Sequence, residues 1–70
     1  MAFYRVKMTE GIIILIEDDR SIETLAGDLV RTGHLMTTKP QIASRRLIGG
    51  SPLVLMLGNV ISIEPSSIDG

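Results

Sequence analysis

The stretch GIIILIEDD, residues 11–19, decides the fold, because it holds five consecutive apolar residues where a half-exposed strand would alternate. The preceding segment FYRVKM (3–8) does alternate. TEG (9–11) therefore predicts a three-residue hairpin loop, with Gly11 supplying the positive φ. The resulting register predicts three cross-strand pairs: Met8 with Ile12, Val6 with Ile14 and Tyr4 with Ile16.

This hairpin has an apolar second face. Phe3, Ile13 and Leu15 share that face with the side-chain stems of Arg5 and Lys7. A short helix can cover one face of a small sheet and leaves the other face without a cover. The sequence therefore raises the question of what covers the second face.

The segment after EDDR predicts one amphipathic helix at about 21–32. Ser21 is a suitable N-cap, and Gly33 suits the position just after the last turn. Gly27 lies in the interior of this predicted helix, where Gly is less favourable than Ala. Either another element approaches the helix closely at this position, or the Gly has no structural reason. The apolar stripe has a period of 3.6 residues and comprises Ile22, Leu25, Ala26, Leu29 and Val30.

The second half of the chain predicts further strands and turns. In order, we expect a strand at 34–38, a turn at 39–40, an undecided segment at 41–48, a loop at 49–52, a strand at 53–57, a turn at 58–59 and a strand at 60–64. The fold class is α+β, with the order β-β-α-β-β-β and a small, mainly antiparallel sheet or partly closed barrel. Residues 1–65 form one domain, and residues 66–70 are expected to fray.

The composition limits how such a short chain can be stabilised. A domain of 70 residues buries only about 60% of its unfolded surface and is marginally stable alone. The sequence contains no Cys and one His, which excludes disulfides, thiolate metal sites and multi-His sites within one chain. Association with another chain is the stabilising device that remains.

No combination of residues predicts catalysis, a metal or a cofactor. His34 has no partner acid or nucleophile indicated by spacing, and a solvated position near the helix end explains it. Glu17–Asp19 lacks the spacing of a calcium-binding loop. Gly49–Gly50 lacks the frame of a phosphate-binding loop. We therefore predict a protein that is not an enzyme.

Basic residues gather in the middle of the chain, and they are the candidates for nucleic-acid contact. The net charge of −1 gives no general attraction to nucleic acid, and no nearby aromatic residue offers a stacking platform. Protection of a sheet edge or the rim of an interface also explains these charges, and it is the interpretation that we favour. The candidates are Arg31, Lys39, Arg45 and Arg46.

Two segments resemble the signature segments of Sm-like RNA-binding proteins. VKMTEG (6–11) matches through Gly11, and LGNVISIEP (57–65) matches through Gly58, Asn59, Val60 and Ile63. The resemblance implies ring assembly and RNA binding at the junction of neighbouring subunits. The chain departs from that family because its helix follows the second strand, its first segment lacks the Asn, and Leu57 replaces a basic residue. A small oligomeric nucleic-acid binder is therefore the alternative function.

The leading hypothesis is a small, non-enzymatic protein that self-associates through its strands and acts through protein contacts. A dimer is favoured, and a ring or closure of the chain's own sheet into a barrel are the other options. A third possible function is the binding of a small ligand in a pocket between subunits, which fewer sequence features support. We expect a cytoplasmic protein without a membrane span, because MAFYRVKM (1–8) carries charge and the apolar runs are short. The predicted interface comprises Phe3, Arg5, Lys7, Ile13, Leu15, Val54 and Met56.

Overall fold

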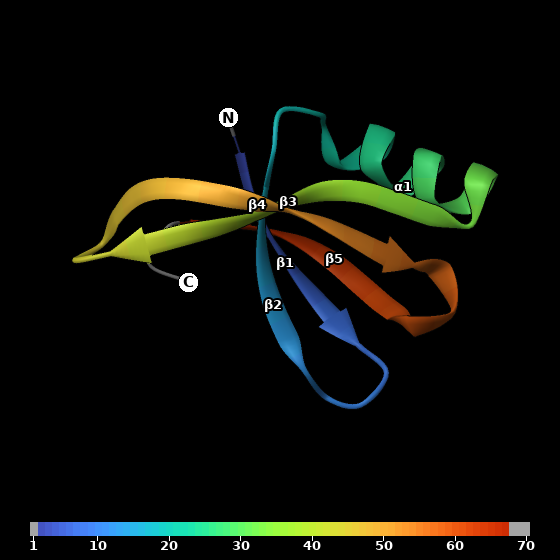
Figure 1. Ribbon diagram of the computed structural model, residues 1–70. Helices are drawn as coiled ribbons and strands as arrows, with labels where there is room; N and C mark the ends of the chain where they lie inside the picture. The colour runs from blue at the N-terminus through green and yellow to red at the C-terminus, as the bar shows by residue number, and fades with distance from the viewer. Residues whose placement is uncertain (1, 68–70) are drawn as a thin grey trace.

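The computed structural model describes residues 2–67 and confirms the α+β class with the order β-β-α-β-β-β. The elements are β1 (Ala2–Met8), β2 (Ile13–Asp18), α1 (Ile22–Thr32), β3 (His34–Ala43), β4 (Arg46–Met56), the 3-10 turn η1 (Leu57–Asn59) and β5 (Val60–Ser66). Figure 1 shows them in one continuous arrangement, with α1 lying over β3. Among the described residues, no helix is long and apolar enough to cross a membrane.

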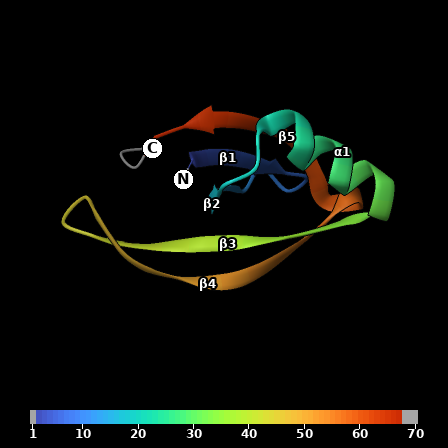
Figure 2. The ribbon, with the colours of Figure 1, turned by 90° about the horizontal axis from the view of Figure 1, so that it is seen from above.

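The five strands form one antiparallel sheet in the order β4-β3-β2-β1-β5. The sheet curves strongly, so that β3 and β4 run beneath β1, β2 and β5, with α1 at one end (Figure 2). β4 and β5 remain separate edges, and the barrel is therefore not closed. The core fills the space inside this curve and consists of Tyr4, Val6, Ile16, Leu25, Leu29, Leu35 and Leu55.

The hairpin of β1 and β2 has the predicted register. Tyr4 faces Ile16 and Val6 faces Ile14. The Met8 N–H donates to the carbonyl of Ile12 at 2.7 Å, and the intervening loop turns at Gly11 with φ of 79°. These contacts confirm the three-residue loop.

β2 pairs with β3 at one position, Glu17 with Thr38. Hydrogen-bonded positions alternate along an antiparallel pair, and the Ile12 carbonyl points to β1. The backbone groups of Ile13 and Leu15 therefore point away from β1, into the opening between β2 and β3. Among the described residues, this stretch of β2 has no partner on β3.

The helix begins and ends where the sequence predicts. The Ser21 side chain accepts a hydrogen bond from the Thr24 N–H at 3.2 Å, and Gly33 ends α1 in the left-handed region with φ of 80°. Leu25 and Leu29 are buried, whereas Ala26 is exposed and Val30 is 70% exposed. The prediction that the whole stripe packs on the sheet is therefore wrong for Ala26 and Val30. Only a narrow strip of the helix, along Leu25 and Leu29, packs on the curved sheet. Ala26 and Val30 each follow one of these leucines in the sequence and face outward.

Gly27 lies in open space, because a Cβ added there would meet no atom within 4 Å. Close approach of another element therefore does not explain this residue. We expect Gly27→Ala to raise the free energy of unfolding by about 0.5–1 kcal/mol, since Ala has the higher helix propensity. Urea titration followed by circular dichroism measures the change, and equal or lower stability would contradict it.

β3 and β4 form a longer hairpin than the sequence predicts. The turn lies at Ser44 and Arg45, which have φ of 51° and 62°, and residues 41–43 and 46–48 are strand. The turn predicted at 39–40 and the loop predicted at 49–52 are wrong, because both segments pair with each other across the hairpin. The glycines fit this strand: a Cβ on Gly50 would lie 2.5 Å from the Thr38 Cγ2 atom.

Each edge strand contains a proline. Pro52 lies in β4 and Pro65 in β5, and edge strands tolerate a residue that cannot donate a backbone hydrogen bond. Pro65 faces Tyr4 and Ser66 faces Phe3, so β5 continues two residues beyond the predicted strand end. The predicted fraying of 66–70 stays a prediction, because residues 68–70 lie outside the described part of the chain.

Candidate functional site

The predicted interface residues occupy two outward faces of the curved sheet. The face of β1 and β2 carries Phe3, Arg5, Lys7, Ile13 and Leu15, and the face of β3 and β4 carries Val54 and Met56. Figure 2 shows these strands as two layers around the core, so their outer faces point away from each other. The alternation in the sequence correctly predicted which side chains of each strand point outward. The curvature of the sheet then separates the predicted interface residues into two groups on different faces.

The outer face of β1 and β2 combines apolar and charged groups. Ile13 is 59% exposed and lies opposite Lys7 in the ladder. Arg5 forms an exposed ion pair with Glu64 of β5, with the two atoms 3.3 Å apart. Phe3 is half-buried. The side of residues 12–16 that carries Ile13 is thus left without a cover by residues 2–67, and Leu15 on the same side is half-buried.

The outer face of β3 and β4 is more apolar. Met36, 65% exposed, lies directly opposite Val54, and Met56, 52% exposed, lies opposite His34. Exposed apolar residues that are contiguous mark contact surfaces more often than isolated ones. Met36 was missed as an interface residue, although the alternation within HLMTT (34–38) places it on the side of Val54.

Three of the four predicted nucleic-acid residues lie together on an arm, which we define as residues 39–50 of the β3–β4 hairpin. Lys39, Arg45 and Arg46 are exposed there and form no ion pair with the described residues. Figure 1 shows this hairpin extending well beyond the body of the protein. Arg31 lies apart from the arm on α1, where it forms an ion pair with Asp28.

A groove of about 330 Å³ opens between the loop of the β1–β2 hairpin and β4. Its walls are mainly apolar, with Glu10 as their charged residue. Its β2 wall is Ile14, which lies in the stretch of β2 that has no paired residue on β3 among residues 2–67. The apolar walls include Met8, Ile12, Ile14, Leu53 and Leu55.

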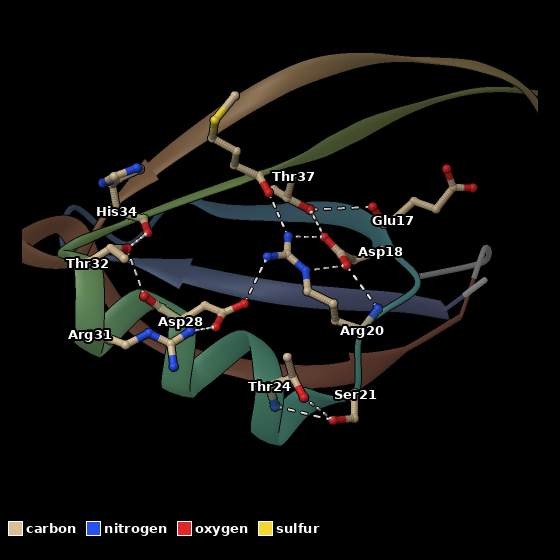
Figure 3. A network of polar contacts seen from close by, with 11 residues as sticks. Glu17, Asp18, Arg20, Ser21, Thr24, Asp28, Arg31, Thr32, His34 and Thr37 are labelled. Carbon is tan, nitrogen blue, oxygen red and sulfur yellow. Dashed lines mark hydrogen bonds and ion pairs between the residues drawn. The ribbon is translucent and has the colours of Figure 1, made fainter.

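Arg20 ties β2, α1 and β3 together (Figure 3). Its guanidinium donates two hydrogen bonds to the Asp18 carboxylate at 2.8 and 2.7 Å, and one to Asp28 at 3.2 Å. It also donates to the Met36 carbonyl at 2.6 Å, while the Thr37 hydroxyl donates to Asp18 at 2.8 Å. No sequence pattern predicted this network, and the available signal was a carboxylate, Asp18, two residues before an Arg.

The hydrogen bonds from Arg20 hold the pKa of the Asp18 carboxyl well below its usual range, although burial acts in the opposite direction. The same contact raises the pKa of Arg20 above its usual range. The charged form of Asp18 therefore forms an ion pair with Arg20 inside the protein, and this pair stabilises the folded state.

The remaining polar candidates form no reactive arrangement among residues 2–67. The His34 side chain makes no hydrogen bond there. The Thr32 hydroxyl lies within hydrogen-bond distance of two backbone carbonyls, that of Asp28 at 2.8 Å and that of His34 at 2.7 Å. Glu17, Asp18 and Asp19 line one small cavity. No group of three or more His, Cys, Asp or Glu side chains in this range is arranged to hold a metal ion.

The chain was compared with protein-family models, with curated proteins and with solved structures, and none of them matches it. The resemblance to Sm-like proteins therefore stays a prediction from two short segments.

Proposed function

We propose that this protein is a non-enzymatic, self-associating protein that acts through protein contacts. The observation that carries the proposal is the pair of outward apolar surfaces, Ile13 on β2 and Met36, Val54 and Met56 on β3 and β4. Leaving such side chains in water forgoes roughly 1.5–3 kcal/mol each relative to full burial. A second copy of a chain this small supplies the missing cover.

A closed dimer is the assembly that we propose first, because two-fold dimers are the commonest symmetric oligomers. A cytoplasmic location belongs to the same proposal, since a sequence without Cys fits a reducing compartment.

Light scattering at high protein concentration tests the proposal, with a dimer mass expected for the wild-type chain. Ile13→Glu and Met56→Glu each place a charge on one outer face, and at least one of them should give a folded monomer. Ile61→Glu is the matched control, because Ile61 is 57% exposed and lies on β5, which contributes none of the predicted interface residues. A wild-type chain that is monomeric at high concentration would overturn self-association.

Nucleic-acid binding is the second candidate, and the cluster of Lys39, Arg45 and Arg46 on the arm favours it. Phosphate contacts by three cations would make binding weaken steeply with salt. The arm has no aromatic residue for base stacking, and the chain's two aromatic residues, Phe3 and Tyr4, both lie in β1. A salt-dependent shift of a mixed oligonucleotide pool would support this alternative.

A further inference from the structure

The arm has a surface composition unlike that of the body. Residues 41–50 are exposed except for Leu47, which is half-buried. They include Ile48, 65% exposed, and Ile42 on the opposite strand. An exposed hairpin with apolar and basic side chains has the composition of a contact element.

The arm also differs from the body in charge. Residues 39–50 contain three of the seven basic residues and none of the eight acidic ones, which gives the arm a charge of +3. Four basic and eight acidic residues then leave the rest of the chain at −4. Opposite net charges of the arm and of the rest of the chain favour contact between the arm of one copy and the body of another.

We propose that the arm of one copy docks in the groove of a second copy, which receives the arm of the first in return. This inference rests on the proposed self-association and specifies its contact. Figures 1 and 2 both show the arm tip far from the loop of the β1–β2 hairpin, which borders the groove, so a chain cannot fill its own groove. Reciprocal exchange of two arms closes a two-fold dimer.

The docked arm would meet groups of matching chemistry. Ile42 and Ile48 bring apolar surface to the apolar walls, and the basic turn reaches the carboxylate of Glu10 at the rim. Ile14 of β2 lines the groove, and the stretch of β2 around it has no paired residue on β3 among residues 2–67. An added strand can pair with such an edge, which is a common mode of peptide recognition.

The first test reverses the charge of one residue on the arm and of one residue in the groove. Analytical ultracentrifugation measures the dissociation constant of the dimer for each variant. Arg46→Glu and Glu10→Arg should each weaken the dimer about tenfold or more. The double variant should recover most of the lost affinity, since it restores opposite charges. Glu23→Arg is the matched control, because it makes the same charge change on α1, at a residue that does not line the groove.

The turn of the arm allows a second test that separates docking from folding. Ser44 and Arg45 hold positive φ, which Asn and Gly adopt with less strain. Ser44→Asn with Arg45→Gly should therefore raise the melting temperature of the hairpin while weakening the dimer. Ser44→Asn alone should retain dimer affinity.

The outcomes distinguish this inference from the proposed function. A dimer that is sensitive to Ile13→Glu or Met56→Glu but unaffected by Arg46→Glu and Glu10→Arg would overturn arm docking and leave self-association standing. Failure of the double charge exchange to restore affinity would also overturn it. A monomeric wild-type chain whose binding to oligonucleotides is lost in Arg46→Glu would overturn both and assign the arm to nucleic acid.

Discussion

Leu25→Ala should lower the free energy of unfolding by about 2–5 kcal/mol, which is the cost of deleting a buried leucine side chain. Leu25 has no exposed surface and belongs to the core together with Ile16 and Leu35. The total stability of small domains is about 0.05–0.15 kcal/mol per residue, so this single change consumes much of it. We expect a largely unfolded chain at 37 °C.

Thermal unfolding by circular dichroism measures this effect, and Val30→Ala on the same helix is the control. Val30 is 70% exposed, so its truncation should change stability by about 0.5 kcal/mol or less. Equal melting temperatures of Leu25→Ala and Val30→Ala would show that α1 does not close the core.

Arg20→Ala should lower the free energy of unfolding by about 3–5 kcal/mol, because it leaves a buried carboxylate without its cation. The Asp18 side chain is 9% exposed, and the Arg20 guanidinium donates two hydrogen bonds to it that the alanine variant would lose. Arg20→Lys should recover only part of the loss, since an ammonium group cannot bind both carboxylate oxygens in the same planar geometry. Urea titration at pH 7 measures all three proteins.

The same ion pair predicts how stability depends on pH. The folded chain lowers the pKa of Asp18 below its usual value of 3.8, so the folded state binds this proton more weakly than the unfolded state. The stabilisation is complete above that value and is lost as the pH falls through the folded pKa. Asp18→Asn should flatten the decline of stability below about pH 4. An unchanged acid limb would assign the decline to other carboxylates.

Local sequence patterns predicted the elements whose determinants lie close together in the chain. Gly11 and its flanking alternation predicted the first hairpin, and Ser21 with Gly33 predicted the helix ends. The loop predicted at 49–52 is wrong because glycine and proline also suit an edge strand that lies close to its neighbour. Gly50 lies this close to Thr38. Local composition cannot distinguish that position from a loop.

The features that no sequence pattern predicted depend on the curvature of the sheet and on contacts between residues far apart in the chain. The Arg20 guanidinium donates a hydrogen bond to the Met36 carbonyl of β3, sixteen residues further along the chain. No local sequence pattern predicts this contact. Alternation showed that Leu15 and Val54 point outward but not that their strands curve into opposite layers. The groove joins residues of the first hairpin to residues of β4, and that neighbourhood depends on the three-dimensional course of both segments.

The two edge prolines limit how copies of this chain can accumulate. Fibrils grow when a strand edge offers an uninterrupted row of donors and acceptors to the next molecule. Pro52 interrupts the row on β4, and Pro65 interrupts it near the end of β5. The chain is rich in β-branched residues and exposes isoleucines at its surface, so we expect these two interruptions to oppose open-ended growth if copies associate.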